Sequence, residues 1–247
     1  MARKQVKPRV NIHRNEEGSL ISNEKEILNT WVRYFDKLLN RRKDNDCSTL
    51  TIASSNQISK GNTQNTTDAP TSKEIETALK KLKNYEAPGT DNIPAELLKF
   101  GGEGLKQWLK HIFSSMWIKE EIPKDRLKGI ICPMHNKDNQ LECANYRCIT
   151  LLNVTYRVFS IISYTRLLPH LESKLGHYQV GFHTWKSTTN QIFVLWQILE
   201  QMKELRISIH LLFIDFKSGH DSSDGEWMYE AMNELNIPER LIRLVKW

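Results

Sequence analysis

Apolar residues recur every three or four positions in several parts of the chain, a spacing that places them on one face of an α-helix. The pattern predicts helices over residues 23–42, 71–82, 105–116, 151–172, 189–205 and 224–247. Thr71 and Glu74 have the spacing of a capping box, which sets the start of the second helix, and Asn23 with Glu26 repeats that spacing at the first. The chain is therefore predicted to be rich in amphipathic helices.

Two segments have the pattern of strands instead. Residues 129–134 are mostly apolar and lead into a polar stretch over 135–142, which predicts a hairpin. Residues 208–214 form a second strand-like run that ends in Asp215. A short helix is expected to begin at Pro94, because proline suits the first helical position. Helices around a few strands, without regular βαβ alternation, predict an α+β fold.

Residues 44–70 interrupt these patterns. Eighteen of these 27 residues are Ser, Thr, Asn, Gln or Asp, so the stretch is too polar to bury itself. We therefore expect a basic arm and an amphipathic helix over 1–43, a polar linker over 44–70 and the main domain over 71–247. The cations of the arm, which contains no acid, are Arg3, Lys4, Lys7, Arg9 and Arg14.

The composition is 39% hydrophobic and 26% charged, which is ordinary for a folded chain of 247 residues. No apolar run is long enough to span a membrane, and the N-terminus has no apolar signal core. Four cysteines do not form a disulfide framework, so we expect an intracellular location, in the cytoplasm or the nucleus. The net charge of +6 weakly favours a polyanionic partner.

Three groups of polar residues are candidates for chemistry. Asp215 and Asp221 flank a strand end and could bind a hard divalent cation, although their spacing alone is more typical of a solvated loop acid or a helix cap. Lys137 and Arg147 lie on opposite arms of the hairpin and could grip a triphosphate, although surface hairpins often carry such residues. Residues 179–189 form either a loop that contacts a nucleic-acid backbone or a simple turn before a helix.

Four potential soft metal ligands fall within the hairpin region: Cys132, His135, Cys143 and Cys148. Small zinc sites are usually built from paired Cys-x2-Cys units, which this chain lacks. Cys132 also sits inside an apolar strand. These observations favour thiols without a metal.

Several motifs occur in a specific order along the chain: Ala87–Lys99, Cys143–Leu152, Gln179–Phe182 and Phe213–Lys217. In this order they resemble the reverse transcriptase of LINE-type (non-LTR) retrotransposons, from the fingers into the first palm motif. Residues 17–40 resemble the segment that precedes the polymerase in those elements. The resemblance covers about residues 15–247.

The resemblance implies helix-rich polymerase fingers with an incomplete palm, preceded by an N-terminal helix and a flexible linker. It also implies an RNA-directed DNA polymerase that transfers nucleotides to a primer 3′-hydroxyl, with Mg²⁺ (or Mn²⁺) as cofactor and an RNA template, a DNA primer and dNTP as partners. Asp215 would be the catalytic, metal-binding aspartate. The nucleotide-binding residues would be Lys137, Arg147, Phe216 and His220, and the template-binding residues Gln179, Gly181, Phe182 and Lys186.

The chain departs from the family pattern at several of these positions. The fingers tip has Asn136-Lys137-Asp138-Asn139 where the family has Lys-Lys-Gly-Asp. His220 stands where the family has the Tyr or Phe that excludes the ribose 2′-hydroxyl. Further departures are Cys148 for a glycine, His183 and Lys186 for arginines and Gly219 for an alanine.

The sequence contains no Asp-Asp pair, which is the second metal-binding element of the family, and we expect the chain to stop at Trp247 before a thumb. A single carboxylate does not hold two Mg²⁺ ions in the required geometry. The sequence therefore predicts that this chain alone is inactive. The alternative interpretation is a non-catalytic remnant that binds nucleic acid through its basic arm and helices.

Overall fold

The computed structural model describes residues 12–15, 17–40, 68–124, 128–176, 178–183, 185–216, 219, 221 and 223–246. Its elements are β1 (His13–Arg14), β2 (Leu20–Ile21), α1 (Glu24–Leu39), α2 (Ser72–Lys81), α3 (Ala95–Lys99), α4 (Glu103–Lys119), β3 (Ile130–His135), a 3-10 turn (Cys143–Asn145), β4 (Tyr146–Leu151), α5 (Val154–Glu172), α6 (Thr188–Glu204), α7 (Gly225–Glu234) and α8 (Glu239–Val245). The predicted α+β class is confirmed.

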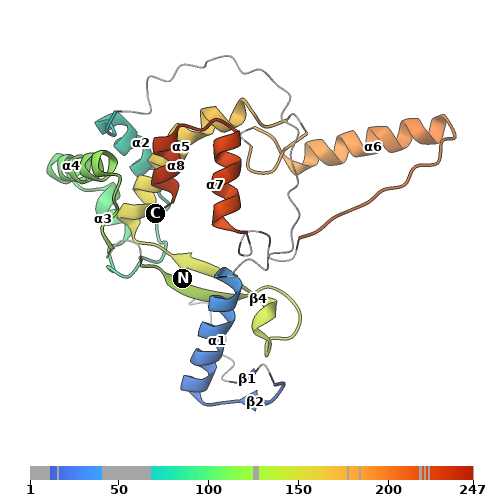
Figure 1. Ribbon diagram of the computed structural model, residues 1–247, viewed down its shortest axis with the longest axis horizontal. Helices are drawn as coiled ribbons and strands as arrows, with labels where there is room; N and C mark the ends of the chain where they lie inside the picture. The colour runs from blue at the N-terminus through green and yellow to red at the C-terminus, as the bar shows by residue number, and fades with distance from the viewer. Residues whose placement is uncertain are drawn as a thin grey trace, which may run out of the picture.

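The main core lies among α2, α3, α4, α5 and α8 (Figure 1). Its largest fully buried side chains include Phe113 and Trp117 of α4 and Phe159 of α5. The α4 residues repeat at a spacing of three to four, so one face of the helix is buried, as its sequence pattern predicts. The Thr71–Glu74 capping box forms at the start of α2, where each side chain accepts a hydrogen bond from the other residue's backbone N–H.

The β3–β4 hairpin and α1 share a smaller core, formed by Trp31 and Phe35 of α1 and by Cys143. The two strands are antiparallel, with Ile130 paired to Leu151 and His135 paired to Tyr146. The aromatic face predicted for α1 therefore packs on the hairpin (Figure 1). The short β1–β2 ribbon, which the sequence pattern did not predict, joins this group.

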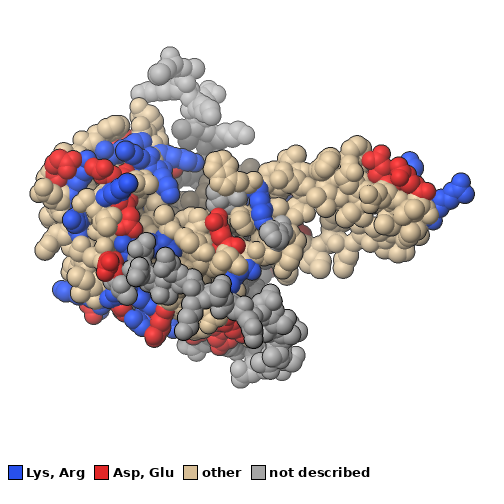
Figure 2. All heavy atoms as spheres, turned by 90° about the horizontal axis from the view of Figure 1, so that it is seen from above, with Lys and Arg blue, Asp and Glu red and all other residues tan. Residues whose placement is uncertain are grey.

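Helix α6 projects from the rest of the molecule as an arm (Figure 1). It contains no buried residue. Figure 2 shows that its surface is mostly uncharged, with acidic and basic side chains at the far end. The arm exposes Ile192, Phe193 and Trp196 by more than half of their surface.

The chain returns from α6 as an extended segment, and here a prediction was wrong. Residues 208–214 form no strand, although their composition is strand-like. The two sheets in the described part of the chain pair only β1 with β2 and β3 with β4, so residues 208–214 have no ladder partner there. An apolar run forms a strand only when another strand supplies hydrogen bonds. Leu212, Phe213 and Ile214 are accordingly 70–85% exposed.

The C-terminal part was predicted as one helix over 224–247 but contains two. Asp224 caps α7 by accepting a hydrogen bond from the Glu226 N–H. The helix ends at Glu234, and Pro238 starts α8, because proline suits a helix start and cannot continue an interior. None of the helices among the described residues is both long and apolar enough to cross a membrane.

Three of the predicted features lie outside the described residues. They are most of the basic arm, over 1–11, most of the polar linker, over 44–67, and His220.

Candidate functional site

The β3–β4 hairpin carries both cations that were predicted to bind nucleotide. Lys137 lies in the connecting loop, and Arg147 lies on β4 opposite Met134. Both side chains are exposed, and neither has an ion pair with the described residues. At the position of the family's turn glycine, Asp138 adopts a left-handed backbone with φ 61°. Aspartate tolerates that conformation better than most residues, so the turn survives the loss of the glycine.

The loop between the strands is fixed by its own hydrogen bonds. The backbone N–H of Asn136 donates to the Asn145 carbonyl over 2.9 Å. The Asn145 side chain donates to the Asn139 carbonyl over 2.9 Å, and the Tyr146 hydroxyl donates to the Gln140 carbonyl over 2.8 Å. Tyr146 is therefore a main support of the loop that presents Lys137.

Tyr146 is itself held by the N-terminal elements. Its ring meets the Trp31 ring edge-on at 4.8 Å and lies 6.1 Å from the ring of His13. The N–H of Arg14 also donates to the Leu141 carbonyl over 2.9 Å. Burial lowers the pKa of His13, although a hydrogen bond with the Leu141 backbone opposes this effect. The segment before the hairpin thus supports the loop from one side.

Replacing Trp31 with alanine is expected to loosen this loop. Removal of the ring leaves Tyr146 with one edge-on contact, to His135 at 5.2 Å, so the amides of residues 136–145 should exchange with solvent about tenfold faster or more. Amide hydrogen exchange measures this directly. Val32→Ala, which changes an exposed neighbour on the same helix, should leave exchange unchanged. Equal exchange in Trp31→Ala and in the wild-type chain would contradict this support.

The predicted template residues lie together in the loop between α5 and α6. Gln179 and Gly181 are joined by a hydrogen bond from the Gln179 side chain to the Gly181 carbonyl, of 3.2 Å. The Lys186 ammonium donates to the Gln179 carbonyl over 3.3 Å. Phe182 is 85% exposed and has a left-handed backbone with φ 58°. The structure thus brings this group of four residues together. Ser187 occupies the N-cap position of α6, but its hydroxyl donates to the Asn190 side chain and makes no capping hydrogen bond to the backbone.

Asp215 and Phe216 lie on the exposed return segment. Asp221, the second acid considered for a cation, instead lies against the hairpin, where the Cys148 thiol approaches its carboxylate at 3.9 Å. Burial and this carboxylate raise the pKa of the Cys148 thiol. The structure therefore places Asp221 beside β4, and Asp215 and Asp221 do not form a joint cation site.

The residues present do not by themselves fit a complete magnesium site. Among the described residues, no group of three or more His, Cys, Asp or Glu side chains could hold a metal ion. Mg²⁺ requires near-octahedral oxygen ligands, whereas Asp215 offers one exposed carboxylate beside the Phe216 carbonyl.

The cysteines of the hairpin region are free thiols: Cys132, Cys143 and Cys148. The register pairs Cys132 with Ile149 and Cys148 with Pro133, so the two strand cysteines are not direct cross-strand partners. Burial raises the pKa of Cys143 to about 11. A thiol with a raised pKa is a poor nucleophile at neutral pH.

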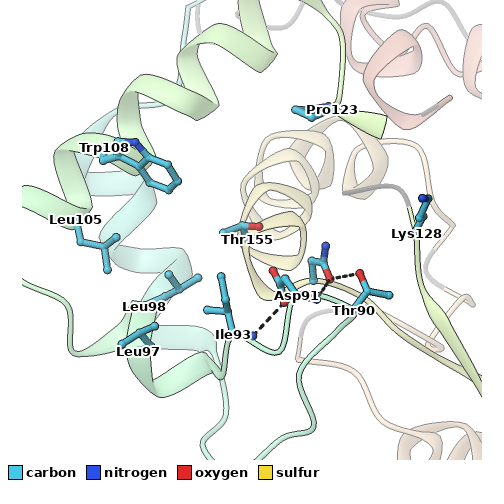
Figure 3. Close-up of a pocket in the computed structure, with 11 residues that line it drawn as sticks. Thr90, Asp91, Ile93, Leu97, Leu98, Leu105, Trp108, Pro123, Lys128 and Thr155 are labelled. Atoms are coloured by element: carbon cyan, nitrogen blue, oxygen red, sulfur yellow. Dashed lines mark hydrogen bonds between the residues drawn. The ribbon is translucent and has the colours of Figure 1, made fainter. Parts of the chain in front are cut away.

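A cleft of about 890 Å³ lies between α3, α4 and the start of α5 (Figure 3). Its polar end is formed by Thr90 and Asp91, which donate hydrogen bonds to the Asn153 side-chain oxygen, of 3.1 and 3.4 Å. Trp108 lines the apolar end (Figure 3). Gly89 makes this packing possible, because a Cβ there would lie 2.5 Å from the Asn153 backbone nitrogen. The Ala87–Lys99 motif thus builds a cleft that the sequence did not reveal.

Most of the exposed cationic hairpin and the helices that follow it fall within a segment that matches a known family. Residues 134–246 match the family described as "Reverse transcriptase (RNA-dependent DNA polymerase)", and every predicted site residue lies in that range. Residues 134–246 are therefore similar to reverse transcriptases, and the predicted resemblance to the LINE-type (non-LTR) retrotransposon enzymes is confirmed.

A curated protein of Xenopus laevis, the "Transposon TX1 uncharacterized 149 kDa protein", is 18% identical to this chain over 173 residues. The aligned part is 70% of this chain but only 13% of that protein. The chain therefore spans a small part of the length of this relative.

Proposed function

We propose that this chain forms the nucleotide-binding fingers of an RNA-directed DNA polymerase. The observation that carries the proposal is the β3–β4 hairpin within the reverse transcriptase segment, with Lys137 on its loop and Arg147 exposed on β4. An incoming dNTP carries a triphosphate, and the guanidinium of Arg147 can donate two parallel hydrogen bonds to it. Lys137 adds a point charge at the tip.

We further propose that the loop with Gln179, Gly181, Phe182 and Lys186 contacts the RNA template, and that a DNA primer completes the substrate. The hydrogen bonds from Lys186 to the Gln179 carbonyl and from the Gln179 side chain to the Gly181 carbonyl support a preformed loop. Phe216 and His220 are proposed to lie near the nucleotide, as their match to the family motif implies.

Asp215 is proposed to supply one metal ligand, and the chain alone is proposed not to polymerise. The support is the position of Asp215 on an extended segment whose neighbours Ile214 and Phe216 are 70 and 79% exposed. A carboxylate on such a segment is not held firmly, whereas in-line transfer requires metal ligands fixed by rigid elements. Catalysis would then require further polypeptide to fix Asp215 and to add carboxylates.

A primer-extension assay on an RNA template, with Mg²⁺ or Mn²⁺, tests this proposal. We expect no cDNA from the 247-residue chain, and no difference between the wild-type chain and Asp215→Ala. Production of cDNA by the wild-type chain that is lost in Asp215→Ala would show that the chain is active alone.

A non-catalytic nucleic-acid-binding role is the second candidate, favoured by the net charge of +6. It differs from the first in needing no nucleotide site, so it predicts RNA affinity without dNTP binding. The free thiols support an intracellular location in either case, in the cytoplasm or the nucleus.

A further inference from the structure

The loop between α5 and α6 exposes three aromatic side chains within eight residues. Tyr178 is 83% exposed, Phe182 is 85% exposed and Trp185 is 97% exposed. Aromatic residues are usually buried when nothing binds them, because each carries roughly 150–250 Å² of largely apolar surface. Tyr178 and Trp185 have no role in the motif that identified this loop. Their exposure therefore needs a separate explanation.

The loop that presents these rings is anchored. The Gln191 side chain donates to the Tyr178 carbonyl over 2.6 Å, which ties the start of the loop to α6. The backbone N–H of Gln179 donates to the Gly176 carbonyl over 3.1 Å. His183 approaches Glu172 of α5 at 4.0 Å. The backbone is thus held at several points, and an exposed ring on a held backbone is a preformed contact surface.

The charge around the rings favours a polyanion. Residues 173–199 contain no Asp or Glu, whereas they include Lys186, which directly follows Trp185 in the chain. Single-stranded nucleic acid is bound by such a combination, in which aromatic rings stack on unpaired bases and cations follow the backbone. A protein partner would require only the apolar surface and no excess of cations.

We propose that Tyr178 and Trp185 form a base-stacking surface for unpaired RNA or DNA, beside the template contacts of the same loop. This inference rests on the proposed template binding. It adds that the nucleic-acid strand is held by stacking of its bases on the two rings. Stacking does not depend on base identity, because every base has a π-face, so the surface binds without sequence preference.

The test uses the full chain and a fluorescein-labelled, unstructured RNA of roughly 12 nucleotides, whose binding is followed by anisotropy. Trp185→Ala and Tyr178→Ala should each weaken the affinity by about 5- to 100-fold, since base–aromatic stacking contributes on that scale. Between about 50 and 200 mM salt, the slope of affinity against salt should stay that of the wild-type chain, because phosphate contacts are kept. Trp185→Phe should restore most of the affinity.

Tyr85→Ala is the matched control. Tyr85 is 96% exposed and, like Trp185, has a left-handed backbone, but it lies between α2 and α3. Tyr85→Ala should leave the RNA affinity unchanged. A loss of RNA affinity equal to that in Trp185→Ala would overturn the assignment of the stacking surface to this loop. Wild-type affinity in both loop variants would overturn the stacking surface while leaving template binding intact. Failure of the wild-type chain to bind RNA would overturn template binding itself. A change of oligomeric state in Trp185→Ala with unchanged RNA affinity would show a protein interface instead.

Discussion

Arg166→Ala is expected to destabilise the folded chain by about 3 kcal/mol, because it leaves a partly buried carboxylate without its partner. Arg166 of α5 donates to both oxygens of Glu74, over 2.7 and 2.9 Å, and to the Asp68 carbonyl over 2.6 Å. Its guanidinium also lies 4.4 Å from the centre of the Trp117 ring. The side chain of Arg166 is only 8% exposed, but that of Glu74 is 30% exposed, which places the effect at the lower end for a buried pair.

Urea-induced unfolding measures this loss. Lys106→Ala, which breaks more exposed ion pairs with Glu76 and Glu103, serves as the control and should cost much less. An equal loss of unfolding free energy in the two variants would show that the Arg166 contacts stabilise the fold no more than the exposed ion pairs of Lys106.

The effect of Arg166→Ala should also depend on pH. Burial raises the pKa of Glu74, but hydrogen bonds from Arg166 and Thr71 outweigh it and lower the pKa from the ordinary 4.5 to about 2. A lowered pKa in the folded state stabilises the fold above 4.5, and this stabilisation is lost as the pH falls towards 2. The difference in unfolding free energy between wild type and Arg166→Ala should therefore shrink over that range. A difference in unfolding free energy that stays constant over this pH range would contradict a stabilising ion pair between Arg166 and Glu74.

Removing the two cations of the hairpin is expected to have the largest effect on ligand binding. Lys137→Ala and Arg147→Ala should each weaken dNTP binding about tenfold, and the double variant about 100-fold, as expected for exposed charge-assisted hydrogen bonds to phosphate. Arg147→Lys should recover only part of the loss, because lysine lacks the bidentate fork. Isothermal titration calorimetry with a dNTP measures these affinities.

Lys110→Ala is the control for non-specific charge, since Lys110 is exposed on α4. It should leave the dNTP affinity unchanged. If it weakened binding as much as Lys137→Ala, the effect would reflect the net charge of the chain and not a site on the hairpin.

Much of the fold could be predicted because the signals are local. The capping box at Thr71 fixes the start of α2, and the apolar spacing around Phe113 fixes the buried face of α4. The hairpin follows from an apolar run and a polar turn close together in sequence. Each of these features depends on residues a few positions apart.

The features that were missed depend on contacts between distant residues. Whether residues 208–214 form a strand depends on a partner strand, which their own composition does not report. The contact of Trp31 with Tyr146 joins positions more than a hundred residues apart. The exposure of Trp185 could not be read from the sequence either, because an isolated tryptophan is more often buried.

The proposed binding of a triphosphate at the hairpin is tested by photo-crosslinking with an azido-substituted dNTP and mass-spectrometric mapping of the labelled peptides. We expect label within residues 130–151 that is competed by unmodified dNTP and lost in the Lys137→Ala, Arg147→Ala double variant. Label confined to another region, such as the cleft beside Thr90 and Lys128, or undiminished in the double variant, would contradict it.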